Sequence, residues 1–158
     1  MSRPQHSRRV YGPPRFLSFK PAGIPRRKLN PVSLRVDEFE AMRLTDYEGL
    51  DQRDAAAEMG ISPATFSRVL KSARFSLMQA IIEGQGFDIE GGTIDFVHTL
   101  RRCSACGDEE MMQLKSEITS GRTDALFCRR CGSGEVEDLV ESLEGRKETH
   151  RKGDTQNS

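Results

Sequence analysis

Four cysteines form two pairs with the spacing of a metal site. Each pair is a Cys-x-x-Cys-Gly run, and 21 residues separate Cys106 from Cys128. One such turn presents two thiolates to the same side of an ion, so two turns complete the tetrahedral coordination that Zn²⁺ prefers. This is the spacing of a zinc ribbon. The sequence therefore predicts one structural zinc ion, held by Cys103, Cys106, Cys128 and Cys131.

Two other kinds of chemistry fit paired cysteines: a pair of redox dithiols and an iron–sulfur site. A thioredoxin-type dithiol needs a βαβ context, and no such pattern is visible. Cationic dipeptides, Arg101-Arg102 and Arg129-Arg130, stand beside the cysteines. They either contact nucleic acid or offset the negative charge of a four-thiolate zinc site, and charge compensation is the interpretation that we favour.

A second stretch, residues 52–73, has the residue types of a helix-turn-helix. This motif joins two short helices through a tight turn that often contains glycine. Gly60 stands where the chain must turn, and glycine accepts a positive φ without a Cβ clash. Ser62 is a favourable N-cap, and Pro63 is a favourable first helical residue because its missing N–H has no partner there anyway. The alternative is an ordinary helical hairpin with a solvated basic face.

The helix expected from Pro63 to about Glu83, ended by Gly84, has two different faces. The face predicted to be buried follows three- and four-residue steps through Phe66, Val69, Leu70, Ala73, Leu77 and Ile81. The opposite face has no acidic residue before Glu83. A recognition helix uses such a face in the major groove. The predicted DNA contacts on it are Pro63, Ala64, Thr65, Ser67, Arg68, Lys71, Ser72 and Arg74.

Among these residues, Arg68 is the candidate for a guanine edge, because the guanidinium fork matches the O6 and N7 acceptors. Lys71 and Arg74 lie further along the helix and are expected to meet phosphates.

Charge is distributed unevenly, although the 158 residues carry no net charge. Residues 1–36 have nine Lys or Arg and no acid, whereas residues 37–92 have five basic and eleven acidic residues. Six of the seven prolines lie in residues 1–31, which makes a helix unlikely there and predicts an extended or irregular basic arm. Its candidate DNA contacts are Arg8, Arg9 and Arg15. The alternative is a disordered tail.

Two more elements are expected around the helix-turn-helix. Residues 36–49 read as a first helix, with Asp37 as N-cap, Glu40 completing a capping box and Gly49 at its end. Residues 87–96 alternate apolar and polar types around a Gly-Gly pair, which predicts a β-hairpin with Ile89 opposite Ile94. Such a hairpin either forms a wing beside DNA or only covers the core.

Several classes of protein are disfavoured by what the sequence lacks. It contains no run of 18 apolar residues for a membrane span and no apolar segment of a secretory signal near its start, so we expect a cytoplasmic protein. It also shows no nucleophile–base pair, phosphate loop or open metal site, so we do not expect an enzyme.

From Arg3 to Gly92 the chain resembles the prokaryotic family called uncharacterised protein family 0251, also domain of unknown function 134. The resemblance lies in the N-terminal proline-rich run, VDEFEAMRLTDYEGL, AAAEMGISPATFSRVLKSAR and IEGG. It implies a DNA-binding protein with a helix-turn-helix similar to region 4 of sigma-70 factors.

The expected fold class is mainly α: a three-helix helix-turn-helix domain with an extended basic N-terminal arm, followed by a small β zinc-ribbon module. The expected boundaries are 1–31 for the arm, 32–92 for the DNA-binding domain, 93–142 for the ribbon and 143–158 for a disordered tail. The expected function is sequence-specific binding of double-stranded DNA by a transcriptional regulator. The alternative is a zinc-ribbon adaptor for RNA polymerase or for an RNA or ribosomal partner.

Overall fold

The structure is a computed structural model that describes residues 6–114, 127–141 and 143. Contacts divide the chain into two units, and each is described by itself below. Unit 1 comprises Met1–Val10 and Phe16–Asp95, and unit 2 comprises Tyr11–Arg15 and Phe96–Ser158. The tail expected over residues 143–158 lies outside the described residues apart from Leu143.

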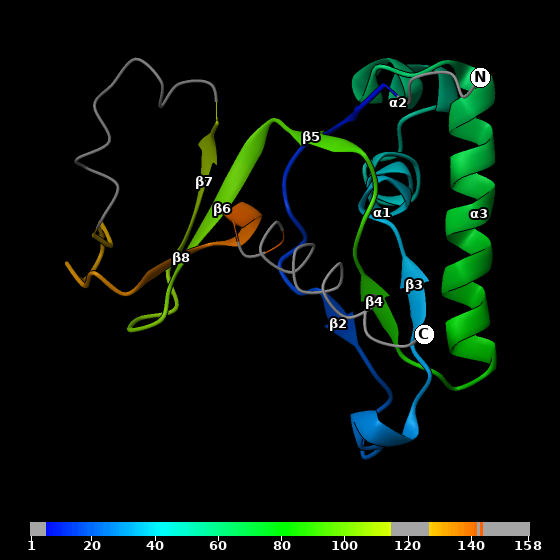
Figure 1. Cartoon of the computed structure of the whole chain (residues 1–158). Helices are drawn as coiled ribbons and strands as arrows, with labels where there is room; N and C mark the ends of the chain where they lie inside the picture. The colour runs from blue at the N-terminus through cyan, green and yellow to red at the C-terminus, as the bar shows by residue number, and fades with distance from the viewer. Residues whose placement is uncertain (1–5, 115–126, 142, 144–158) are drawn as a thin grey trace, which may run out of the picture. The chain divides into compact units, whose positions relative to one another are not determined.

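The helices of unit 1 surround one apolar core. They are α1 (Val36–Met42), the π-helix η2 (Arg43–Tyr47), α2 (Gln52–Met59) and α3 (Pro63–Ile82). Figure 1 shows α2 near the beginning of α3, with α1 beside α3 further along. The helices meet at small and apolar side chains, which lets their backbones approach closely. The core consists of Ala41, Leu44, Ala55, Ala56, Met59, Phe66, Val69 and Leu70.

The turn between α2 and α3 has the predicted local geometry. Gly60 is left-handed, with φ of 65°. The Ser62 hydroxyl accepts a hydrogen bond from the Thr65 N–H at 3.2 Å, and Pro63 is the first helical residue. Asp51 caps α2: its Oδ1 accepts hydrogen bonds from the N–H groups of Arg53 and Asp54, both at 2.9 Å. These predictions are confirmed because each depends on residues that are close in sequence.

The first helix begins at Val36 as predicted, but its predicted N-cap is wrong by two residues. Arg35, not Asp37, is the N-cap, and its N–H donates to Glu38 Oε2 at 2.9 Å. Asp37 is instead almost completely buried and faces two arginines. The sequence offers several neighbouring acids for the cap and does not distinguish them. Because a buried charge needs partners of opposite charge, Asp37 pairs with arginines, and Glu38 completes the cap instead.

The N-terminal region, for which we expected an extended or irregular arm, contributes extended strands to two sheets. It contains β1 (Arg8–Val10), β2 (Ser18–Phe19), the 3₁₀ helix η1 (Arg26–Lys28) and β3 (Val32–Leu34). Strand β1 pairs with β5 (Ile94–Phe96), and β2 and β3 flank β4 (Phe87–Ile89). The described residues thus form three sheets beside the helices, and the predicted mainly α, three-helix fold class is wrong.

The hairpin expected at Gly91-Gly92 does not form, although both of its strands do. Strand β4 pairs antiparallel with β2 and parallel with β3, so both of its edges are occupied. Both glycines have positive φ, 72° and 98°, and the chain passes there from one sheet to the other. Ile89 therefore pairs with Leu34 rather than with Ile94.

Unit 2 contains a three-stranded antiparallel sheet. Its strands are β6 (His98–Cys103), β7 (Glu109–Gln113) and β8 (Val136–Asp138), in the order β7-β6-β8. The first cysteine turn begins at Cys103, the last residue of β6, so the sheet fixes its position directly. The second cysteine turn precedes β8. Few large side chains are buried in the described part of this unit: Leu100, Leu139, Val140 and Leu143. In the described part of the chain, no helix is long and apolar enough to cross a membrane.

Candidate metal centre and nucleic-acid interface

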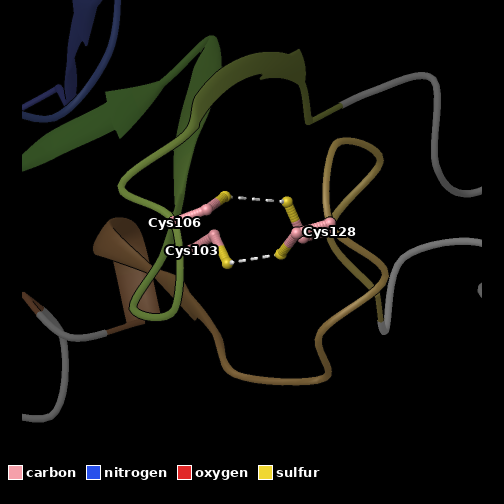
Figure 2. Close-up of side chains that lie close together, drawn as sticks. Cys103, Cys106 and Cys128 are labelled. Atoms are coloured by element: carbon pink, nitrogen blue, oxygen red, sulfur yellow. Dashed lines mark hydrogen bonds between the residues drawn. The ribbon is translucent and has the colours of Figure 1, made fainter.

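The four cysteines converge on one point, as their spacing predicts. Figure 2 shows the side chains of two loops pointing toward each other. The sulfur atoms of Cys103 and Cys131 lie 3.6 Å apart, as do those of Cys106 and Cys128, and all four lie within 4.8 Å of one another. A tetrahedron with Zn–S bonds of about 2.3 Å has edges of about 3.8 Å. The four thiols are free of disulfides and have the separation that a tetrahedral metal ion requires.

The two cysteine turns have the same backbone structure. In the first, the Gly107 N–H donates to the Cys103 carbonyl at 2.9 Å, and in the second the Gly132 N–H donates to the Cys128 carbonyl at 2.8 Å. Both glycines have φ of 73°. Glycine is suited to this left-handed position because any other residue except Asn or Asp is strained there. The Cys-x-x-Cys-Gly sequence therefore determines the turn locally.

The thiols of the site have different electrostatic surroundings. A backbone hydrogen bond at Asp108 acts to lower the pKa of Cys106, but desolvation and hydrogen bonds with the other thiols outweigh it and raise this pKa to about 12, and the pKa of Cys131 is also raised. Backbone N–H groups of Cys131 and Arg130 lower the pKa of the Cys128 thiol to about 7. A lowered pKa supplies thiolate, which is the form that ligates a metal ion. The four cysteines can thus hold a metal ion, and their thiolate donors and tetrahedral spacing suit Zn²⁺.

Three of the four arginines beside the cysteines are paired with acids of the same unit, and Arg101 donates to the Met112 sulfur at 3.6 Å. Arg129 lies 2.6 Å from Glu110, and Arg102 lies 2.9 Å from Glu109. Arg130 is more loosely placed, at 3.8 Å from Asp108. A cation that already faces a carboxylate gains less from a phosphate, so this surface is poorly suited to nucleic acid.

The first half of α3 presents the predicted DNA contacts in two groups. The first group is exposed: Pro63, Ala64, Ser67, Arg68 and Lys71. Arg68 and Lys71 make no ion pair or side-chain hydrogen bond with the described residues, so their donors are available to a ligand.

The second group is engaged within the unit. The Thr65 hydroxyl lies 2.9 Å from that of Ser62. The Ser72 hydroxyl donates to Glu38 Oε1 at 2.6 Å, and Arg74 donates to Asp46 at 2.6 and 3.2 Å. The side-chain hydrogen bond from Arg74 lowers the pKa of Asp46. These side chains must break an existing contact before they can bind DNA.

The arm arginines also have partners in the protein. Arg8 forms an ion pair with the buried Asp37, and Arg9 donates to the Ala57 carbonyl at the end of α2, at 3.0 Å. Arg15 belongs to unit 2, where its guanidinium lies 3.3 Å from Glu109. Arg8 and Arg9 thus attach the N-terminal strand to the helices of unit 1.

A cleft of about 600 Å³ lies beside the beginning of α3. Burial, together with the nearby charge of Arg35, lowers the pKa of the Arg8 guanidinium that lines it. Arg35 was not among the predicted site residues, because only the fold brings it to the same cleft as Ser62 and Thr65. The lining comprises His6, Arg8, Arg35, Asp37, Gly60, Ile61, Ser62, Thr65, Gly92 and Thr93.

These features define a protein of two units: a mixed α/β unit built on the α2–α3 pair, and a β unit with a four-cysteine site able to hold a metal ion. The chain belongs to the family described as "Protein of unknown function DUF134", which matches residues 1–97. The resemblance to this family in the sequence is thereby confirmed.

Relatives of the family extend over both units. A "UPF0251 protein" of Chloroherpeton thalassium is 44% identical over 147 residues, covering 93% of each chain. One from Moorella thermoacetica is 43% identical over 153 residues, covering 97% of this chain and 95% of its own. One from Desulforudis audaxviator is 47% identical over 136 residues, covering 86% and 85%. No solved structure matches the chain.

Proposed function

We propose that the protein binds double-stranded DNA through the first half of α3 and acts as a transcriptional regulator. The observation that carries this proposal is the exposed pair of uncommitted cations, Arg68 and Lys71, on a helix face with no acid. Small side chains at Ala64 and Ser67 leave the helix surface low enough to approach base edges in a major groove.

The two cations are expected to act differently. Arg68 has a planar fork that can donate two hydrogen bonds to a guanine, which discriminates bases by about 1–3 kcal/mol. Lys71 lies three residues further along the helix and carries a point charge, so it suits a phosphate.

The cleft beside the start of α3 supports the same proposal. Its lining includes the Arg35 side chain, 46% of which is exposed, together with Ser62 and Thr65 at the beginning of the helix. Such groups commonly bind backbone phosphates and set the register of a recognition helix. Because Arg35 already faces Asp37 at 3.0 Å and Glu38 at 3.8 Å, Lys71 stays the proposed phosphate contact.

We further propose that the metal ion is a single structural Zn²⁺. All four tetrahedral positions are filled by cysteine sulfur, so none is open for catalysis. Its role is to hold together a unit whose described part buries few large apolar side chains.

Selection of binding sites from random duplexes tests the DNA proposal. We expect wild type to select a defined sequence and Arg68→Ala to lose the base preference at one position. Lys71→Ala should weaken binding to all sequences and reduce the log–log salt slope by about 0.9. Arg130→Ala, which removes an equal charge from unit 2, is the matched control. It should leave the base preference and the salt slope unchanged. Absence of salt-dependent duplex binding by wild type would refute the proposal.

A further inference from the structure

The outward face of α3 changes character halfway along the helix. Beyond Lys71 it carries four large apolar side chains with high exposure: Phe75 (68%), Met78 (49%), Ile81 (61%) and Ile82 (77%). We call these four residues the apolar stripe. The sequence pattern placed Ile81 on the buried face, and this prediction is wrong because Ala80, which is 1% exposed, takes the inward position.

The apolar stripe has the size of the largest apolar patches that monomeric proteins expose. Side chains of this size present on the order of 150–250 Å² each, so the exposed parts amount to roughly 450 Å². The largest apolar patch on a typical monomer is about 300–600 Å² and is often functional.

We propose that the apolar stripe is where a second copy of this chain packs, with the two α3 helices antiparallel. A two-fold axis makes the same patch serve both partners, which is how most homodimers form. Two stripes would bury roughly 900 Å², and the flanking side chains bring this near the roughly 1,000 Å² at which specific interfaces begin. The expected dimer is therefore weak. This inference uses the charges of Arg68 and Lys71 but does not require that they bind DNA.

Charge on α3 selects the antiparallel direction. Arg68 and Lys71 precede the stripe on the same face. A parallel pair would bring these cations of the two copies together. In an antiparallel pair centred on the stripe, the two Lys71 positions stand about 22 Å apart along the helix axis, at 1.5 Å per residue. That separation exceeds the Debye length of about 8 Å at physiological salt, so their repulsion is screened.

The centre of the stripe also sets the register. Phe75 and Ile82 are seven residues apart, which places them on the same edge of the helix face two turns from each other. With the two-fold axis between Met78 and Gln79, Phe75 of one copy lies opposite Ile82 of the other copy. Every dimer then contains this pair twice.

Complementary charges test both the surface and the direction. Sedimentation equilibrium of the full chain is measured for wild type, Phe75→Lys, Ile82→Glu and an equimolar mixture of the two variants. We expect a concentration-dependent dimer for wild type and a rise in Kd of about tenfold or more for each variant alone, because each buries an unpaired charge. The mixture should recover the dimer, because lysine then faces glutamate at one pair and the other pair is native.

Tyr47→Lys, which changes a largely exposed aromatic residue outside the stripe, is the matched control and should leave the wild-type Kd unchanged. A monomer at all concentrations would overturn the proposal. So would a dimer insensitive to both substitutions, and a mixture that stays monomeric would overturn the antiparallel arrangement. Recovery in the mixture also shows that both variants are folded. Duplex binding is measured separately on the same proteins, so failure of one proposal does not imply failure of the other.

Discussion

The two units of this protein are stabilised in different ways. Unit 1 has a continuous apolar core between its helices and three buried acids, Asp37, Glu38 and Glu40, each engaged by arginine or backbone groups. The described part of unit 2 buries few large side chains and gathers its four cysteines at one point. The first is expected to fold through packing and the second through metal ligation.

Loss of a metal ligand should have the largest effect, and only on unit 2. A structural zinc site contributes an apparent binding free energy of about 10 kcal/mol or more. We expect Cys106→Ser to abolish zinc retention and hydrogen-exchange protection in β6–β8, while α1–α3 stay protected. Elemental analysis and hydrogen exchange measure these effects. Ser104→Ala, a change within the same turn that spares the ligands, is the control. Retained protection in the apo protein would show that packing alone holds unit 2.

Loss of the ion pair between Arg8 and the buried Asp37 should have the second-largest effect, a decrease in the stability of unit 1. Arg8→Met leaves Asp37, 1% exposed, with Arg35 as its remaining cation. Loss of one partner of a buried pair is destabilising, and because Arg35 remains we expect about 2 kcal/mol. Urea unfolding followed by the helical signal measures this. Arg27→Met, at an exposed arginine, should change the stability by less than about 0.5 kcal/mol. Equal effects of the two variants would show that the Arg8 pair is unimportant.

Substitution of Gly60, in the turn before α3, should have a smaller effect on stability than loss of the Arg8–Asp37 pair. At φ of 65°, a Cβ at Gly60 is strained, and it would also lie 3.2 Å from Arg9 Nε. We expect Gly60→Ala to lower the unfolding free energy of unit 1 by about 1–2 kcal/mol. Gly60→Asn should cost less, because asparagine tolerates the left-handed conformation. Thermal unfolding of the two variants distinguishes them, and an Ala variant as stable as wild type would contradict this interpretation.

The exposed ion pair between Arg74 and Asp46 should contribute least to the stability of unit 1. The hydrogen bond from Arg74 lowers the folded-state pKa of Asp46, so its contribution is present above the unfolded-state pKa and is lost as pH falls through the folded-state value. We expect Arg74→Met to reduce stability at pH 7 by at most about 0.5 kcal/mol, because both side chains are about half exposed. The difference from wild type should vanish in strong acid. A difference that persists there would have another cause.

The sequence by itself determined the features that depend on neighbouring residues. The two Cys-x-x-Cys-Gly turns, the left-handed Gly60 and the caps at Asp51 and Ser62 all follow from hydrogen bonds within a few residues. The limits of α3 follow in the same way, with Pro63 at its start and Gly84 just past its end. Local geometry leaves little choice at these places.

Only the tertiary structure decided which distant segments meet. The alternation around Gly91-Gly92 located two strands, but β4 takes its partners from β2 and β3 in the N-terminal region, because long-range packing outweighs a local hairpin. The basic N-terminal region likewise gave no sign that Arg8 neutralises Asp37. Periodicity placed Ile81 inward, whereas the packing of α3 against β3 and α1 turns it outward and leaves the apolar stripe exposed.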